Sequence, residues 1–325
     1  MVKVMQIHGL GDADVLRPAD VALAPPGPGQ VRLRHQAAGV NFVDIYLRSG
    51  SVHSVNAFPT VLGVEGAGVI EEIGEDVSGF RPGDRVVWCG PPSGGYAEAV
   101  LIDARRLVGL PAGISFEQAG GAMLRGLTTY MILNRVTHAQ AGETILIHAA
   151  AGGLGLVLAQ WARHLGLRVL GTVGSDAKAD LAAAHGVESP IITAREDFVE
   201  ATRRLTDGRG VDIVVDGIGG SVLTHSLDCL APFGQLVSVG QAGGDLPPLD
   251  IEELGPKRSI ALSRPSSFAF TRDLPAYRRG LQEMLWMMEN GLKISIGARF
   301  TLTDAAQAHR AMENRQTSGS VILIP

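Results

Sequence analysis

One short segment, residues 148–155, has the composition of a nucleotide-binding turn. Its sequence is His-Ala-Ala-Ala-Gly-Gly-Leu-Gly, and it lies between an apolar segment that starts at Thr144 and an apolar stretch with helical spacing. Positions 150, 152 and 155 have the spacing of the G-x-G-x-x-G fingerprint, with alanine in the first place. Gly152 would let the backbone approach a diphosphate, and Gly155 would let the helix pack on the strand. We therefore predict a dinucleotide site at this helix N-terminus.

The end of the next predicted strand indicates which dinucleotide is bound. NAD-binding folds place an acidic residue there to contact the ribose 2′-hydroxyl. Here the segment 171–178 is Gly-Thr-Val-Gly-Ser-Asp-Ala-Lys, with no acid at the strand end. Gly174 and Ser175 leave room, and Lys178 supplies a positive charge, which favours a 2′-phosphate and hence NADPH. Asp176 argues against this choice, and Lys178 could also be an ordinary solvated helix residue.

Other catalytic chemistries have little support. The nine histidines include no close pair at metal-ligand spacing, and the two cysteines, Cys89 and Cys229, cannot form a Cys-rich zinc lobe or a disulfide scaffold. We expect His148 to pack beneath the glycine turn rather than to bind a ligand. No G-x-S-x-G motif is present, so a nucleophile-elbow hydrolase is not indicated.

Two kinds of segment must position these residues. The first third has short alternating or β-branched segments punctuated by Gly and Pro, as in 31–40, 63–74 and 80–88, which indicates an antiparallel, barrel-like domain. From Thr144 the chain alternates strand and helix. Strands are predicted at 144–148, 168–173, 191–192, 211–216, 235–239 and 259–263, with helices at 154–165, 177–185, 198–205 and 222–230. Such repeats form a parallel sheet with helices on both faces.

The segments at either end of the strand–helix region complete the organisation. Residues 115–134 have helical spacing after a Ser-x-x-Gln start signal. After Arg264 we expect a helix at 276–290, a strand at 298–301, a helix at 304–314 and a strand at 321–324, which return to the first domain. We therefore predict an α/β protein with a β-rich domain, 1–123 and 265–325, and a doubly wound dinucleotide-binding domain, 124–264.

Composition sets limits on the function. The 325 residues carry 28 Lys and Arg against 33 Asp and Glu, a net charge of −5, so nucleic acid is not an expected partner. Residues 144–162 contain no Asp, Glu, Lys or Arg, but a strand, a glycine turn and a helix explain them better than a membrane span. The start of the chain lacks the features of a signal peptide, and two cysteines suit a reducing compartment, so we expect a cytoplasmic protein without a membrane segment.

Several segments together resemble a known family. They occur in the family's order along the whole chain: Asn-Phe-Val-Asp-Ile-Tyr-Leu-Arg-Ser-Gly at 41–50, Gly-Val-Glu-Gly-Ala-Gly at 63–68, Pro-Gly-Asp-Arg-Val at 82–86, Gly-Leu-Thr-Thr-Tyr at 126–130, the glycine turn, and 315–325. The sequence is similar to the zinc-free, zeta-crystallin-like quinone oxidoreductases of the medium-chain dehydrogenase/reductase superfamily.

The resemblance implies a GroES-like first domain, a Rossmann second domain, NADPH as cofactor and a homodimer. It also implies the roles of particular residues. Asn41, Thr128 and Gln241 would lie near the nicotinamide. Gly152, Gly153 and Leu154 would contact the diphosphate, and Gly174, Lys178 and Arg315 would surround the 2′-phosphate. Tyr46 would line the substrate cleft.

The sequence also departs from related proteins at several positions. Where family members often carry a tyrosine after the Arg-Ser-Gly, this chain has Val52 followed by His53, and Thr193 stands where some have a tyrosine. Zinc alcohol dehydrogenases of the superfamily have a ligand cysteine and histidine where this chain has Asn41 and Val64. Neither replacement is a usual zinc ligand.

These features predict a hydride transfer without metal. Alcohol oxidation is not expected, because nothing would stabilise the alkoxide. A quinone or an enone takes hydride directly, so the protein need supply only orientation and a dry site. Asn41 and Tyr46 are the candidate catalytic residues, although Tyr46 could either donate a proton or only shape the pocket. We predict an NADPH-dependent quinone reductase. The alternatives are a reductase of α,β-unsaturated carbonyls and a non-catalytic nucleotide- or RNA-binding, crystallin-like protein.

Overall fold

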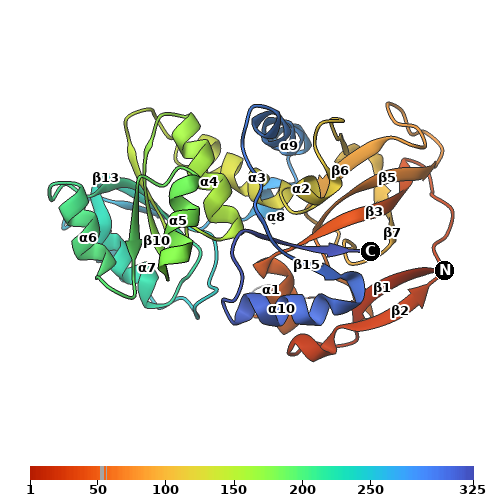
Figure 1. Ribbon diagram of the computed structural model, residues 1–325, viewed down its shortest axis with the longest axis horizontal. Coiled ribbons are helices and arrows are strands. Elements are labelled where there is room, and N and C mark those ends of the chain that lie inside the picture. The colour runs from red at the N-terminus through yellow and green to blue at the C-terminus, as the bar shows by residue number, and fades with distance from the viewer. Residues whose placement is uncertain (52–54, 56) are drawn as a thin grey trace. The chain divides into compact units, whose positions relative to one another are not determined.

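The computed structural model describes residues 1–51, 55 and 57–325 of the chain (Figure 1). Val52 and His53, where the sequence departs from the family pattern, lie outside the described residues. The chain divides into two compact units. Unit 1 comprises Met1–Leu127 and Phe270–Pro325, and unit 2 comprises Thr128–Ala269.

Unit 2 is built on a six-stranded sheet in which every neighbouring pair is parallel. Its strand order is β11-β10-β9-β12-β13-β14. The strands are β9 (Thr144–Ile147), β10 (Arg168–Val173), β11 (Ser189–Ile192), β12 (Val211–Asp216), β13 (Leu230–Ser238) and β14 (Ala261–Ser263). All six strands lie where the sequence predicts them, because apolar runs such as Thr-Ile-Leu-Ile in β9 are buried on both faces of a parallel sheet.

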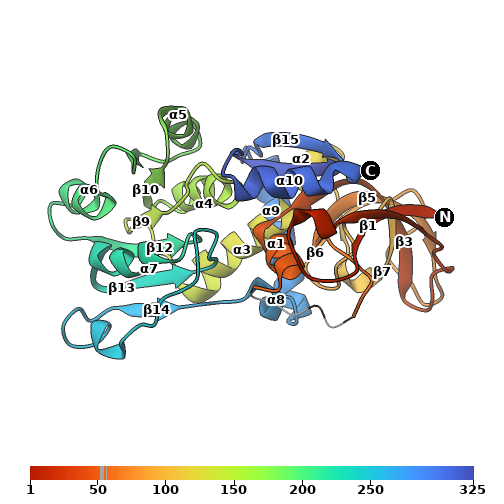
Figure 2. The ribbon, with the colours of Figure 1, turned by 90° about the horizontal axis from the view of Figure 1, so that it is seen from below.

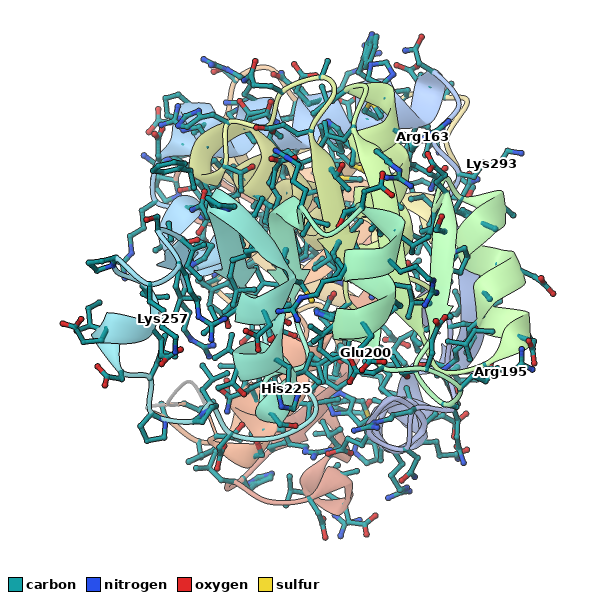
Figure 3. All side chains as sticks on the ribbon, turned by 90° about the vertical axis from the view of Figure 1, so that its left-hand side faces the viewer. Arg163, Arg195, Glu200, His225, Lys257 and Lys293 are labelled. Carbon is teal, nitrogen blue, oxygen red and sulfur yellow. The ribbon has the colours of Figure 1, made fainter. Side chains whose placement is uncertain are left out.

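Four helices connect these strands: α4 (Gly153–His164), α5 (Asp176–Ala184), α6 (Phe198–Leu205) and α7 (Ser221–Ser226). Right-handed crossovers place α4 and α5 on one face and α6 and α7 on the other, because the strand order reverses direction at β9. Figure 2 shows α4 and α5 together on one side of the sheet. Leu146, Val214 and Leu236 form a core with the apolar residues of α6 and α7. Charged side chains such as Arg163 and Glu200 lie on the outer surface (Figure 3).

Unit 1 is β-rich, as predicted. A seven-stranded sheet has the order β15-β16-β3-β5-β6-β8, with β7 also paired to β3, and a three-stranded sheet has the order β2-β1-β4. The strands are β1 (Val2–Ile7), β2 (Arg17–Val21), β3 (Gln30–Val40), β4 (Thr60–Val61), β5 (Glu65–Ile73), β6 (Arg85–Cys89), β7 (Ala99–Asp103), β8 (Val108–Gly109), β15 (Ile296–Thr301) and β16 (Ser320–Ile324). Because β16 pairs antiparallel with β3, the last strand joins the sheet formed by the first third of the chain.

Six helices complete the fold: α1 (Phe42–Ser49), α2 (Phe116–Gly120), α3 (Met123–Tyr130), α8 (Ser267–Phe270), α9 (Leu274–Glu289) and α10 (Ala305–Glu313). The helical spacing over 115–134 does not give one helix. Ser115 and Gln118 form the predicted capping box, but α2 ends at Gly120, and a π-helical turn follows α3. A Cβ on Gly120 would lie 2.7 Å from the Ala37 carbonyl oxygen, so this approach to β3 requires glycine.

The chain contains no helix, among the residues described, that is both long and apolar enough to cross a membrane. The uncharged stretch 144–162 forms strand β9, the glycine turn and most of helix α4 instead. This confirms the prediction of a strand, a turn and a helix for that stretch.

Gly155 provides a test of the close packing between α4 and β9. A Cβ at this position would lie 2.6 Å from the Ala149 carbonyl oxygen and 2.7 Å from the Ala150 Cα atom, which are backbone atoms that cannot move aside cheaply. We expect Gly155→Ala to lower the free energy of unfolding by roughly 1–3 kcal/mol, as overpacking does, measured by denaturant unfolding. Gly255→Ala is the control, because the nearest atom to its Cβ would be 3.8 Å away. Equal stability of the two variants would contradict this account.

Candidate functional site

The glycine turn presents bare backbone N–H groups at the centre of the sheet of unit 2. Helix α4 begins after its N-cap residue, Gly152, and this cap makes no side-chain hydrogen bond. The first N–H groups of a helix lack partners within the helix, and they carry the positive end of its dipole. Ala149 has a φ of 50°, and its carbonyl oxygen accepts from the Gly152 N–H at 2.8 Å. The turn can therefore hold an anion such as a diphosphate.

A second group of polar residues follows the neighbouring strand, β10. A Cβ on Gly174 would meet no atom within 4 Å, so the space beside the strand end is open. Ser175 caps α5 by accepting from the Lys178 N–H, which places Lys178 in the first turn of that helix. Asp176, which argued against NADPH, forms an ion pair with Arg195 at 2.5 Å. The Asp176 charge is therefore offset by a cation, and that weakens the objection to a 2′-phosphate.

A third group lies at the ends of β12, β13 and β14, on the other side of the glycine turn. The side-chain oxygen of Gln241 accepts from Arg264 Nη2 at 2.9 Å, and Arg264 Nη1 donates to Ser238 Oγ at 3.0 Å. Asp216 is fully buried and accepts from the Ile218 N–H at 2.7 Å. Burial raises the pKa of Asp216 above its ordinary value. The hydrogen bond from Arg264, together with the one that Gln241 Nε2 donates to Asp245 Oδ1 at 3.2 Å, fixes the orientation of Gln241 at the edge of the sheet.

The three groups lie along one edge of the sheet of unit 2, at the carboxyl ends of its strands. Their order follows the strand order: the group with Gly174 and Lys178 after β10, the glycine turn after β9, and the group with Gln241 after β13. Ligands of open parallel sheets bind at this edge, where the strand order reverses.

In unit 1 the predicted residue Asn41 is held by a buried ion pair. Its Nδ2 donates to Glu65 Oε1 at 2.8 Å, and Arg125 Nη1 donates to the same oxygen at 2.8 Å. The Leu124 N–H donates to the other oxygen of Glu65, and Arg125 also donates to the carbonyls of Gly121 and Val40. Glu65 is 0% exposed, so this carboxylate is stable only because three donors surround it.

A second buried polar cluster lies beside Asn41 and fixes helix α1. Asp44 accepts from the Asn41 N–H at 2.8 Å and from the Tyr96 hydroxyl at 3.2 Å, and His309 Nε2 lies 2.9 Å from that hydroxyl. Burial raises the pKa of Asp44 to about 7, against the lowering effect of its hydrogen bonds. Burial and the charge of Arg48 lower the pKa of His309 to about 3.

The remaining predicted residues are spread over both units. Tyr46 lies in α1, half-buried, with its ring centroid 6.3 Å from that of Phe42. Arg315 follows α10 in unit 1 and has a φ of 57°. Thr128 lies in α3, at the start of unit 2. The structure thus brings Gly152, Gly153 and Leu154 together on one turn and Gly174 close to Lys178, while Asn41, Tyr46 and Arg315 belong to unit 1.

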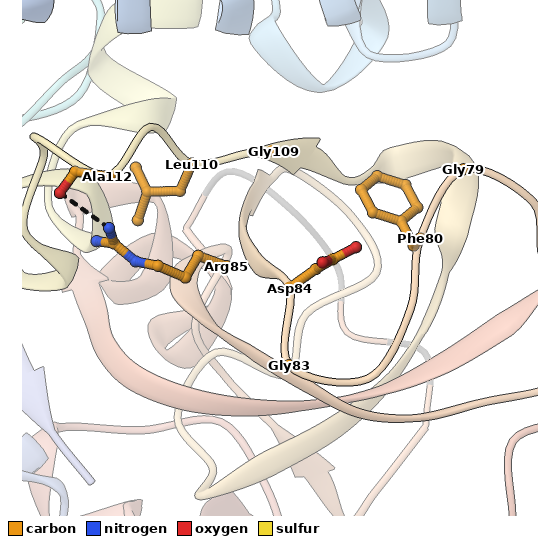
Figure 4. Close-up of a pocket in the computed structure, with 8 residues that line it drawn as sticks. All are labelled: Gly79, Phe80, Gly83, Asp84, Arg85, Gly109, Leu110 and Ala112. Atoms are coloured by element: carbon orange, nitrogen blue, oxygen red, sulfur yellow. Dashed lines mark hydrogen bonds between the residues drawn. The ribbon is translucent and has the colours of Figure 1, made fainter.

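Unit 1 also contains a pocket (Figure 4). None of the predicted site residues lines it. Arg85 closes one side by donating from Nη1 to the Ala112 carbonyl at 3.0 Å. The lining residues are Gly79, Phe80, Gly83, Asp84, Arg85, Gly109, Leu110 and Ala112. We assign no function to this pocket, because turns line it and the guanidinium of Arg85 is already hydrogen-bonded to a backbone carbonyl.

The sequence did not identify three residues of these groups. Asp44 lies within the family-like segment 41–50, and Arg125 lies just before the segment 126–130. Only the structure shows that Arg125 contacts Glu65 and that Asp44 contacts Tyr96, and these buried contacts hold Asn41 in place. Arg264 stands directly after β14, and a charged residue at the end of a predicted strand was the available signal.

Comparisons with known proteins agree with this arrangement. Residues 153–278 match the family model described as zinc-binding dehydrogenase, and residues 27–112 match the alcohol dehydrogenase GroES-like domain. The chain is 40% identical to the quinone oxidoreductase of Pseudomonas aeruginosa over 326 residues, with 100% of both chains covered. The chain belongs to the quinone oxidoreductase family. Membership of this family confirms the predicted resemblance and the fold of a GroES-like and a Rossmann-type domain.

Two further relatives are similar over the whole length of the chain. One is the 2-haloacrylate reductase of a Burkholderia species, which is 39% identical, with 100% of this chain and 99% of the relative covered. The other is the crystal structure of Escherichia coli quinone oxidoreductase complexed with NADPH. It has a TM-score of 0.95 and 35% identity, and the match covers 99% of this chain and 100% of that chain.

The zinc named in the description of the matching model does not fit the residues of this family member. Asn41 and Val64 offer neither a thiolate nor an imidazole, and both oxygens of Glu65 accept hydrogen bonds. Within the described ranges there is no group of three His, Cys, Asp or Glu side chains that could hold a metal ion. We therefore derive no step through a metal.

The raised pKa of Asp44 predicts a pH-dependent stability. Folding favours its protonated form, so its contribution is full below the ordinary pKa of 3.8 and is lost as the pH rises through about 7. We expect Asp44→Asn to reduce the loss of unfolding free energy between pH 4 and 7, measured by urea unfolding at several pH values. Asp20→Asn, at an exposed site, controls for the removal of one negative charge. Equal pH dependence in Asp44→Asn and the wild type would contradict the assignment.

Proposed function

We propose that this protein is an NADPH-dependent quinone reductase that transfers hydride to its acceptor without a metal ion. The observation that carries the proposal is the uncapped N-terminus of α4 at the centre of the parallel sheet, next to the open end of β10, where Lys178 lies in the first turn of α5. Similarity to the Pseudomonas aeruginosa and Escherichia coli quinone oxidoreductases supports the acceptor class, and the NADPH bound in the latter supports the cofactor.

The cofactor would be held mainly by backbone groups. The N–H groups of Gly153, Leu154 and Gly155 would bind the diphosphate, and Gly152 leaves space for it. We propose that Gly174, Lys178 and Arg315 surround the 2′-phosphate. Thr128, Gln241 and Asn41 would contact the nicotinamide. Each of these assignments extends the sequence prediction and is open to substitution experiments.

The protein residues would bind and orient the reactants. When bound, NADPH supplies a hydride. Because the carboxylate of Glu65 can only accept, the amide of Asn41 must turn its NH₂ group toward Glu65, and its oxygen is then held in one direction. Tyr46 carries a hydroxyl on helix α1, whose N-cap is Asn41. We propose that this hydroxyl donates a proton to the reduced acceptor. The alternative role of Tyr46 is to shape the pocket.

A second candidate acceptor is an α,β-unsaturated carbonyl or carboxylate. The 39% identity to a 2-haloacrylate reductase favours it. Steady-state oxidation of NADPH with a panel of quinones and enones separates the two. We expect higher kcat/KM with quinones. Turnover with enones alone would replace the first proposal with the second, and tight NADPH binding without turnover on any acceptor would support the non-catalytic class.

We further propose a cytoplasmic homodimer. Strand β14 forms one end of the sheet of unit 2, and exposed strand edges favour pairing with another chain. Phe233 is 89% exposed and bonds through its N–H to Ser259, just before that strand. Both cysteines are free, which suits a reducing compartment. Sedimentation equilibrium of the wild type and of Phe233→Asp tests the dimer, which the substitution should weaken.

We also propose functional roles for the two predicted domains. The substrate and catalytic domain, 1–123 and 265–325, would correspond to unit 1, and the dinucleotide-binding domain, 124–264, to unit 2. The boundaries of the units fall within a few residues of these limits. Expression of residues 124–264 alone, followed by a test for NADPH binding, examines the assignment.

We propose that Lys178 makes the protein bind NADPH in preference to NADH. If its ammonium group contacts the 2′-phosphate, Lys178→Ala should cost ~1.5–3 kcal/mol of NADPH binding, as for a hydrogen bond to a charged group, and almost nothing for NADH. Isothermal titration calorimetry measures both. Lys257→Ala, an exposed lysine paired with Glu253 elsewhere in unit 2, is the control. An equal loss for both nucleotides would reject the role.

A further inference from the structure

The residue just before the glycine turn, His148, is a buried polar side chain with two hydroxyl partners. It is 5% exposed. Its Nδ1 lies 2.9 Å from Thr172 Oγ1 on β10, and its Nε2 lies 2.8 Å from Ser226 Oγ at the end of α7. The ring of Phe198 packs edge-on, with centroids 4.9 Å apart. Both ring nitrogens therefore contact neutral groups that can either donate or accept.

The direction of each hydrogen bond follows from a count of hydrogens. The Ser226 hydroxyl donates to the Val222 carbonyl at 2.6 Å, and a carbonyl can only accept. Because the only hydroxyl hydrogen of Ser226 is used there, His148 Nε2 must donate to Ser226. Burial lowers the pKa of His148 to about 4, so the ring is neutral near pH 7 and Nδ1 carries no hydrogen. The Thr172 hydroxyl therefore donates to Nδ1.

The same chain of hydrogen bonds reaches the backbone of the turn. Thr172 Oγ1, whose hydrogen points to His148, accepts from the Ala149 N–H at 3.3 Å. The Thr172 carbonyl accepts from the next N–H, that of Ala150, at 2.9 Å. Ala149 has a φ of 50°, in the left-handed region that a residue with a Cβ adopts only when its surroundings hold it there. Its conformation sets the direction of the carbonyl that bonds Gly152.

We propose that His148 is a positioning residue for the diphosphate. Through Thr172 it holds Ala149 in the left-handed conformation, and this conformation directs the first N–H groups of α4 toward the ligand. The polar chain runs one way, from the Ala149 N–H through Thr172, His148 and Ser226 to the Val222 carbonyl. His148 does not touch the ligand. That this diphosphate belongs to NADPH rests on the proposed function.

A purely structural role for His148 makes a different prediction. If the imidazole only filled space, loss of the Thr172 hydroxyl would affect stability without selecting one part of the cofactor. If the chain of hydrogen bonds directs the glycine turn, loss of the hydroxyl weakens binding of the diphosphate. Binding of a phosphate near Gly174 and Lys178 is then unchanged. Adenosine 2′-monophosphate has the 2′-phosphate without a diphosphate, so it serves as the matched probe.

The test compares Thr172→Val, which removes the hydroxyl, with Thr172→Ser, which keeps it. Calorimetry should show NADPH binding weakened about tenfold in Thr172→Val and restored in Thr172→Ser, with unchanged binding of adenosine 2′-monophosphate in both. Thr202→Val is the control, because Thr202 is equally buried in unit 2 but lies outside the chain of hydrogen bonds. Unchanged NADPH binding in Thr172→Val, or an equal loss for both probes, would overturn the proposal.

A second measurement needs no cofactor. Nitrogen NMR of ligand-free protein labelled at histidine, with His148 assigned from its absence in His148→Gln, should show a neutral ring with its proton on Nε2 at pH 7. A proton on Nδ1, or a charged ring, would overturn the chain of hydrogen bonds. Absence of NADPH binding by the wild type would refute the proposed function alone, and the NMR result would still test the chain of hydrogen bonds through His148.

Discussion

The close approach of helix α4 to the end of strand β9 is the contact on which the proposed nucleotide site depends. A side chain at Gly155 would overlap the backbone of Ala149 and Ala150, so the helix can start at this point only with glycine there. The N-terminus of this helix has no side-chain cap, and the first N–H groups of a helix have no partner within it. An anion stabilises such groups, and the neighbouring strand ends offer space and positive charge for the rest of a dinucleotide.

Buried charge in unit 1 has a comparable organising role. Both oxygens of the Glu65 carboxylate accept hydrogen bonds, from Arg125, Asn41 and the Leu124 N–H. Breaking the ion pair of Glu65 and Arg125 would leave an uncompensated charge out of water, at a cost of about 3–5 kcal/mol. The pair therefore fixes the orientation of the Asn41 amide.

Much of this arrangement could be predicted from the sequence, because the signals are local. The glycine turn, the six strands of unit 2 and the lack of an acid at the end of β10 are patterns within short windows. The polar clusters were not predicted, because Arg125 and Glu65, or Tyr96 and His309, are distant in the chain and meet only through folding. The prediction of one helix over 115–134 was wrong in the middle of that range, since the contact of Gly120 with β3 overrides helical spacing.

The central claim is that the bare helix end at Gly152–Gly155 binds the diphosphate of a reduced dinucleotide. A crystal structure of the protein soaked with NADPH tests it most directly. The account predicts density for the two phosphates within hydrogen-bonding distance of the N–H groups of Gly153, Leu154 and Gly155. Density for the diphosphate at any other site, or a helix end that stays filled with water at saturating NADPH, would contradict it.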